Sequence, residues 1–108
     1  MAKITFDETK NQRNINIRSL PLSLGGLVLE DEMRIERHDK EHSTPEQDRW
    51  QTIGMAGKVL FTVYTDAVEI PHIISIRLAD TDEKRLYYGE RDLQSGWYRV
   101  NPGRNGNA

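Results

Sequence analysis

The chain has 108 residues and contains no cysteine. Disulfide bonds, thiolate catalysis and zinc sites with cysteine ligands are therefore excluded, and a reducing, cytoplasmic setting is permitted. No apolar run approaches the roughly 18 residues that a membrane-spanning helix needs. The N-terminus also lacks the basic and then apolar layout of a secretory signal. We therefore expect no contact with a membrane.

Apolar and aromatic residues are scarce. The hydrophobic fraction is 36% and the aromatic fraction is 7%, whereas typical globular domains are about 45–50% apolar. Charged residues make up 30% of the chain, and the mean hydropathy is -0.72. A chain of this length and composition is expected to form one domain with a small core.

The chain also lacks an excess of positive charge. Lys and Arg number 15 and Asp and Glu number 17, which gives a net charge of -2. This balance argues against a protein that coats nucleic acid through bulk positive charge, but it leaves room for a local basic site. The acidic excess is concentrated in residues 31–50, which hold seven acidic and four basic side chains.

Two helices are predicted in the N-terminal third, after a short β-prone piece at residues 3–6. Asp7 is a good N-cap for a polar helix over residues 8–17. Ser19 and Pro21 suit the start of a second helix, because proline is tolerated in a first turn. This helix would direct several apolar side chains toward the core: Leu22, Leu24, Leu27, Val28 and Leu29. Two glycines, Gly25 and Gly26, would each destabilise it by roughly 1 kcal/mol relative to alanine.

Four strands follow. Residues 33–38 alternate in polarity, which predicts a strand with Arg34, Glu36 and His38 on a solvent-facing side. A charged loop over residues 39–48 leads to a second strand at residues 49–55. The dipeptide Ala56-Gly57 makes a tight connection to a central β-branched strand at residues 59–65.

The fourth strand and a final helix complete the predicted fold. Residues 72–77 form the strand, with Ile74 and Ile76 facing inward. Asp80 and Glu83 have capping-box spacing and open a short helix that Gly89 closes. This order predicts an α+β domain over residues 1–90, with helices packed on an antiparallel sheet. Residues 91–108 form a C-terminal extension, of which the last eight are expected to fray.

Several short motifs occur in a fixed order along the chain. The first are Phe6-Asp7, Lys10 and Asn14, followed by the turn Ile17-Arg18-Ser19-Leu20. The middle motifs are Arg49, Ile53-Gly54 and Tyr64-Thr65. The last are Ile73-Ile74-Ser75-Ile76-Arg77-Leu78-Ala79, Glu83, Arg85 and Tyr87. This ordered set covers residues 4–90 and resembles the BrnT toxins, the ribonuclease partner of BrnT–BrnA toxin–antitoxin systems.

The resemblance implies a fold similar to that of the RelE/ParE toxins and a cytoplasmic ribonuclease of bacterial type. It also implies a partner, a small BrnA-like ribbon-helix-helix antitoxin that neutralises the toxin in a hetero-oligomer with an antitoxin dimer. The family usually has Lys-His-Gly in the turn after the first helix, where this chain has Ile17-Arg18-Ser19. Residues 95–108 lie outside the resemblance.

Metal-independent cleavage of RNA needs a base for the 2′-hydroxyl, an acid for the leaving oxygen and cations for the phosphate. Arg77 is the first choice of cation, with Arg49 as a second, because a guanidinium matches two phosphate oxygens. The alternative for Arg77 is a salt bridge to a carboxylate such as Glu83. The two arginines are expected to converge at one edge of the sheet. No cofactor is expected.

His38 and His42 are the natural acid–base candidates, and Glu46 is the carboxylate alternative. With His72, these histidines make a metal site conceivable but poorly supported, because the loop lacks helical periodicity. The alternative for the whole segment is a solvated loop without a catalytic role.

Other residues are candidates for binding the RNA substrate. Trp50, Tyr64 and Tyr87 could stack on bases, although such aromatics more often belong to the core. Lys10, Arg13 and Arg18 fall at helical offsets and could bind phosphates, or simply solvate a helix, as could the pair Lys84-Arg85.

Two functions are consistent with these features of the sequence. The first is an endoribonuclease toxin that inhibits translation. The second is a catalytically degenerate toxin-like protein that acts as a partner-binding or transcription-regulatory module. The net charge, the missing histidine in the turn and the paired glycines favour the second. Trp97 and Tyr98 are predicted to bind a partner, or alternatively to fold back onto the core.

Overall fold

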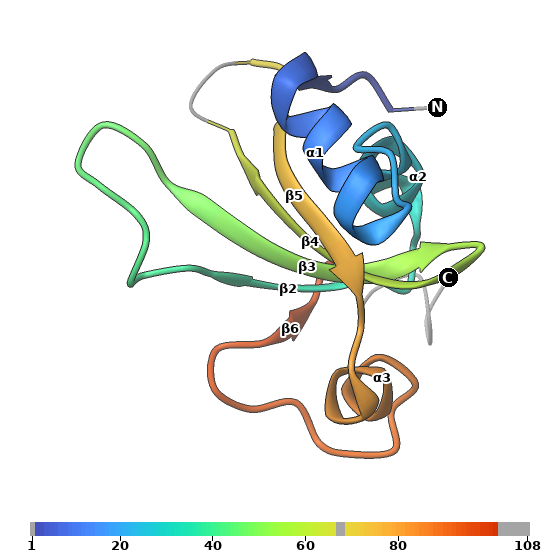
Figure 1. Cartoon of the computed structure of the whole chain (residues 1–108). Coiled ribbons are helices and arrows are strands. Elements are labelled where there is room, and N and C mark those ends of the chain that lie inside the picture. Colours follow the sequence, from blue (N-terminus) through green and yellow to red (C-terminus); the bar gives the residue numbers. More distant parts are fainter. Residues whose placement is uncertain (1, 67–68, 102–108) are drawn as a thin grey trace.

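The computed structural model describes residues 2–66 and 69–101 of the chain (Figure 1). The elements are β1 (Thr5–Phe6), α1 (Glu8–Arg18), α2 (Leu24–Glu30), β2 (Ile35–His38), β3 (Arg49–Ala56), β4 (Lys58–Thr65), β5 (His72–Leu78), α3 (Thr81–Tyr87) and β6 (Tyr98–Arg99). The predicted order of strands and helices is confirmed up to α3, and β6 is an addition. In the described part of the chain no helix has the length and apolar character needed to cross a membrane.

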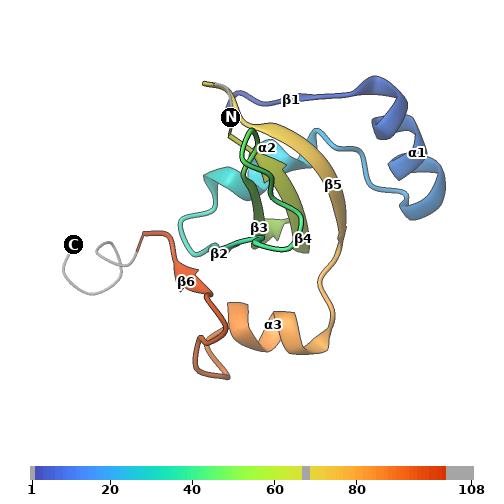
Figure 2. The ribbon, with the colours of Figure 1, turned by 90° about the vertical axis from the view of Figure 1, so that its left-hand side faces the viewer.

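The strands form one mixed sheet in the order β1-β5-β4-β3-β2-β6. Strands β2 to β5 are antiparallel neighbours, as predicted. Strand β1 instead pairs in parallel with β5, with Thr5 opposite His72 and Phe6 opposite Ile73. Helices α1 and α2 lie on one side of the sheet, whereas α3 lies toward the other (Figures 1 and 2). The α+β class is therefore confirmed, while the similarity to RelE/ParE toxins stays a prediction.

The sheet separates two apolar clusters. The cluster under α1 and α2 contains Leu22, Val28, Leu60, Tyr64, Ile73 and Ile76. The cluster toward α3 contains Ile35, Ile53, Val59, Phe61, Ala79, Leu86, Tyr87 and Trp97. A chain with few apolar residues thus divides them between two small cores.

Helix α1 is capped as predicted and is held by its asparagines. The Asp7 carboxylate accepts a hydrogen bond from the Lys10 amide at 3.0 Å. Asn11 and Asn14 are buried. The Asn11 side-chain oxygen accepts from the Leu22 amide at 2.8 Å, and the Asn14 amide donates to backbone carbonyls. Asparagines that weaken an isolated helix therefore attach this one to the rest of the fold.

The second helix differs from the prediction. It begins at Leu24 rather than near Pro21, and the expectation that Leu27 faces the core is wrong, because this side chain is 41% exposed. Gly25 is buried against β5, and a Cβ atom there would lie 2.6 Å from Cδ1 of Ile73. The glycine lowers helix propensity, but it allows the helix to approach the sheet closely.

The prediction that Glu36 faces solvent is also wrong. Its side chain is buried at 6% exposure. Its carboxylate accepts hydrogen bonds from the hydroxyls of Thr52 at 2.6 Å, Tyr64 at 2.8 Å and Tyr98 at 3.3 Å. Three donors from three other strands thus satisfy a carboxylate that would otherwise be costly to bury.

Strand β5 contains an irregularity that moves its apolar face. Val63 of β4 pairs with Ser75, but the next residue, Tyr64, pairs with Ile73, so Ile74 has no partner across the ladder. Such a bulge turns the following side chains to the other face. Ile73 and Ile76 are the fully buried residues, and the prediction that Ile74 faces inward is wrong.

The C-terminal part of the chain returns to the sheet. The capping box of Asp80 and Glu83 is confirmed, with both reciprocal bonds present. Beyond it, β6 pairs with β2, and Trp97 is 8% exposed, with its ring edge-on to Phe61 at 6.3 Å. The alternative that Trp97 folds back onto the core is therefore confirmed. The domain boundary at residue 90 stays a prediction, and residues 102–108 of the fraying segment lie outside the described residues.

Candidate functional site

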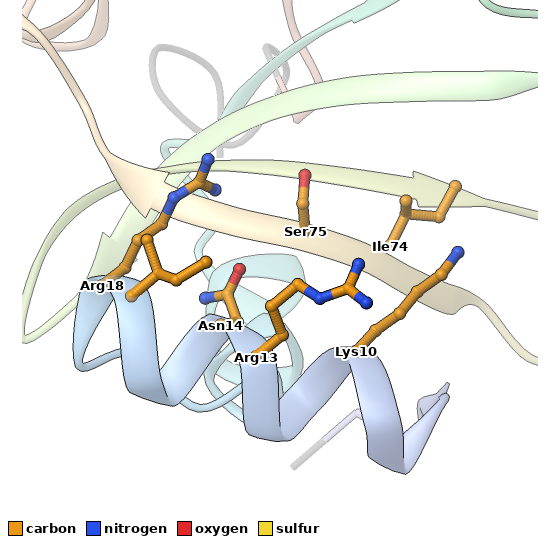
Figure 3. A pocket seen from close by; sticks show the side chains of 7 residues that line it. Lys10, Arg13, Asn14, Arg18, Ile74 and Ser75 are labelled. Atoms are coloured by element: carbon orange, nitrogen blue, oxygen red, sulfur yellow. The ribbon is translucent and has the colours of Figure 1, made fainter.

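A groove runs between helix α1 and the outer edge of strand β5 (Figure 3). It encloses a cavity of about 220 Å³. The helix and the strand edge supply its lining residues: Lys10, Arg13, Asn14, Ile17, Arg18, Ile74 and Ser75. The structure therefore brings together the three predicted basic residues of the N-terminal helix.

The groove exists because β1 is short. It pairs with β5 only at His72 and Ile73, so the following residues of β5 face α1. Asn14 and Arg18 both donate to the carbonyl oxygen of Ile76, at 3.0 and 3.2 Å. Residues four apart share a helix face, so the contacts that fasten α1 to the strand also turn its cationic side toward the groove.

The lining of the groove is cationic and contains no carboxylate. This is a local property, because the chain as a whole carries a net charge of -2. Among the described residues, the side chains of Lys10 and Arg13 form no salt bridge. Cations that lack an acidic partner and line one concave surface favour an anionic ligand.

Arg77 lies at the end of β5 but is bound to α3 rather than open to a ligand. Its two terminal nitrogens donate to the two carboxylate oxygens of Glu83, both at 2.8 Å. Its guanidinium lies over the ring of Phe61 at 3.9 Å. The hydrogen bond to Glu83 raises the pKa of Arg77 above its ordinary value. The salt bridge named as the alternative is therefore present, and a catalytic role for Arg77 stays a prediction.

A sequence profile described as "Ribonuclease toxin, BrnT, of type II toxin-antitoxin system" matches residues 6–83 of the chain. The chain belongs to the BrnT family. The solved structure of the Brucella abortus ribonuclease toxin BrnT is similar, with 21% identity and a TM-score of 0.52 over 75% of this chain and 100% of that chain. At this identity the likeness shows a shared fold. No curated protein matches the chain.

The second arginine predicted for this BrnT-family site is remote from Arg77. Arg49 pairs with Thr65, which pairs with His72, whereas Arg77 pairs with Phe61. The two arginines are thus offset by four residues along the strands, about 13 Å, and Glu83 holds Arg77 toward α3. The expectation that they converge is wrong. The Nε atom of Arg49 is buried and has no hydrogen-bond partner among the described residues.

The histidines of the connection between β2 and β3 are engaged with carboxylates. Nε2 of His38 lies 2.9 Å from Asp48, and Nδ1 of His42 lies 3.0 Å from Asp39. Burial raises the pKa of Asp39, but the bonds from His42 outweigh it, so the net shift is downward. Glu46 is exposed in the same connection. In the sheet order this connection is separated from β5 by β4, and the described residues contain no cluster of three metal-binding side chains.

The predicted stacking aromatics serve internal contacts. The indole nitrogen of Trp50 donates to Asp66 at 3.1 Å, and the Tyr64 hydroxyl is bound to the buried Glu36. The Tyr87 hydroxyl donates to a carboxylate oxygen of Asp31 at 2.5 Å. Burial raises the pKa of both tyrosines, and the adjacent carboxylates raise it further. Stacking on RNA bases stays a prediction for all three.

Sequence reasoning did not place three residues of β5 at an RNA site. Ile74 and Ser75 line the groove. His72, which the sequence offered only as a metal ligand, lies two residues before Ile74, with Nδ1 at 2.8 Å from the Thr5 hydroxyl. Thr5 and His72 are 67 residues apart, and only the parallel pairing of β1 with β5 joins them. No local pattern in the sequence indicates such a contact, so only the structure reveals it.

Proposed function

We propose that this BrnT-family chain is a metal-independent endoribonuclease that inhibits translation by cutting RNA. The groove between α1 and β5 binds the phosphates next to the scissile bond. The observation that carries the proposal is the carboxylate-free lining with Lys10, Arg13 and Arg18. A few placed cations are enough to hold and stabilise a phosphodiester, even in a chain of negative net charge.

The proposal also includes the partner and the setting. A toxin–antitoxin family implies an antitoxin, and we propose a BrnA-like ribbon-helix-helix protein that binds as a dimer in the cytoplasm. The cation-lined groove is a target for such a partner as well as for RNA, because an acidic segment of an antitoxin could occupy it and exclude the substrate.

A second candidate function is that of a degenerate toxin that binds RNA or a partner without cleavage. The observation in its favour is that the arginine and two histidines first expected to catalyse are all bound to carboxylates: Arg77 to Glu83, His38 to Asp48 and His42 to Asp39.

The test is RNA cleavage by the full chain, purified away from antitoxin and assayed in EDTA. We expect endonucleolytic cleavage, and a loss of RNA affinity when Lys10 or Arg13 is changed to Gln. The slope of log affinity against log salt should fall by about 0.7 for each single-strand phosphate contact that is removed.

Lys58→Gln is the matched control, because Lys58 is exposed at the start of β4 and does not line the groove. It makes the same change of charge and should leave affinity and cleavage near those of the parent. Equal losses from Lys58→Gln and Lys10→Gln would contradict the placement of the site. Binding in the groove without any cleavage would favour the degenerate toxin.

A further inference from the structure

His72 lies at the beginning of β5, next to the groove between α1 and β5. It is half-buried, and Ile74 and Ser75, which follow it on the strand, line the groove. Figure 3 shows the Lys10 side chain extending across β5 toward Ile74, that is, toward the end of the strand where His72 lies. His72 is thus the histidine whose backbone position adjoins the proposed phosphate site.

The two nitrogens of this imidazole have different environments. Nδ1 lies 2.8 Å from the Thr5 hydroxyl, and Nε2 has no hydrogen-bond partner within the described residues. A hydrogen bond at one ring nitrogen fixes the orientation of the ring and leaves the other nitrogen for the substrate. His38 and His42 differ, because each faces a carboxylate and lies on the connection between β2 and β3.

The cross-strand register also places His72 on a polar row of the sheet. His72 pairs with Thr65, which pairs with Arg49, and directly paired side chains share a face. Ser75 pairs with Val63, two residues before Thr65, and therefore lies on the same face. RNA whose phosphate is held by α1 would reach this row by crossing the β5 edge.

We propose that His72 is the general base of the reaction and that Thr5 is its positioning residue. This inference rests on the proposed ribonuclease function and names the proton acceptor within the same site. Nε2 takes the proton of a 2′-hydroxyl, and the 2′ oxygen forms a bond to the adjacent phosphorus. The bond from phosphorus to the 5′ oxygen breaks, leaving a 2′,3′-cyclic phosphate. The 5′ oxygen takes a proton from water, and the imidazolium returns its proton to solvent.

The test uses the full chain and an RNA that the parent cleaves. His72→Ala should lower the cleavage rate by about 100-fold or more, the usual contribution of a positioned base. Added imidazole should restore part of this rate, because it supplies the missing proton acceptor. Arg13→Ala is the matched control: it should also lower the rate, but imidazole should not restore it.

His72→Asn guards against a variant that fails to fold, because its amide can still bond to Thr5. It should melt near the parent temperature and lose cleavage to the same degree. For the positioning role, Thr5→Val should lower kcat with an unchanged KM, whereas Thr5→Ser should keep the parent kcat. These readouts separate orientation of the imidazole from a general loss of structure.

Each other result has a definite meaning. A folded His72→Asn protein with the parent rate overturns the assignment of the base and leaves the ribonuclease function standing. A loss in His72→Ala that imidazole does not restore, while His72→Asn keeps cutting, also overturns it. A parent chain that leaves RNA intact overturns both the inference and the function on which it rests.

Discussion

The ion pair between Arg77 and Glu83 joins the end of β5 to the first turn of α3. Removing this ion pair tests whether Arg77 has a structural or a catalytic role. Arg77→Met keeps an apolar stem over Phe61 but removes the charge. Glu83→Gln also removes a charge, yet its amide oxygen can still accept the Asp80 amide hydrogen bond of the capping box. The two substitutions and their combination form a double-mutant cycle.

The magnitude follows from the geometry and exposure of the pair. Both bonds measure 2.8 Å, and the side chains of Arg77 and Glu83 are 38% and 14% exposed. Fully exposed pairs contribute about 0.2–1 kcal/mol, whereas hydrogen bonds to charged groups contribute about 1.5–3 kcal/mol. With one partner largely buried and the other screened by solvent, we expect a coupling energy of about 1–2 kcal/mol.

Urea unfolding of the parent, the two single variants and the double variant gives the coupling energy directly. It should decrease in high salt, since part of it is electrostatic. A coupling energy below about 0.3 kcal/mol, within the usual additivity error, would refute the reasoning that this pair holds α3 to the sheet. A Glu83→Gln protein that cleaves RNA faster than the parent would instead show that Arg77 acts on substrate once it is released.

Three further predictions concern the two cores and one buried hydroxyl. Gly25→Ala should lower the free energy of unfolding by about 1–2 kcal/mol, because overpacking against the buried Ile73 outweighs the gain in helix propensity; a stability in urea at or above that of the parent would contradict this. Trp97→Ala should lower it by about 3–5 kcal/mol, and a shift in thermal unfolding worth less than about 1 kcal/mol would show that the core does not need this ring. Burial, reinforced by Glu36, raises the pKa of Tyr64, so its contribution to stability is full below the unfolded pKa of about 10 and decreases as the pH rises beyond it. Tyr64→Phe should reduce this alkaline loss of stability in urea titrations, and an unchanged loss would point to other groups.

Local signals in the sequence predicted the parts of the fold that depend on neighbouring residues. Asp7 caps α1 and accepts the Lys10 amide, and Asp80 and Glu83 form the capping box of α3. The tight connection after Ala56 is also present, with Gly57 at a φ of +78°. Each of these features is decided within about four residues, where spacing and side-chain chemistry suffice.

Features that depend on residues far apart in the sequence could not be predicted from such local signals. The alternation of polarity in its strand places Glu36 on the solvent-facing side. In the structure Glu36 is buried, and its carboxylate accepts hydrogen bonds from three hydroxyls of other strands. The bulge at Ile74 takes this side chain out of the core and puts Ile73 in its place, while Ile76 is buried as predicted, and no residue type marks the bulge. Both errors come from register, which tertiary packing sets.

The candidate site was predicted in its cations but not in its geometry. Lys10, Arg13 and Arg18 were named as substrate-binding residues, and they do line one groove. The opposite wall was missed, because the sequence indicates both strands but not that β1 pairs in parallel with β5 and leaves the rest of its edge free. The expected convergence of Arg77 and Arg49 was wrong for a similar reason: the sequence shows which residue is basic but not where the pairing of strands places it. Their catalytic roles stay predictions.

The position of helix α1 beside strand β5 has a consequence for the synthesis of the protein. One wall of the groove is made by residues 10–18 and the other by residues 74–75, so the first wall leaves the ribosome long before the second exists. A chain interrupted anywhere before β5 carries the cationic helix without the strand edge that fastens it. If the groove is where RNA is cut, an unfinished chain lacks the complete site, and activity begins only when about two thirds of the chain has emerged.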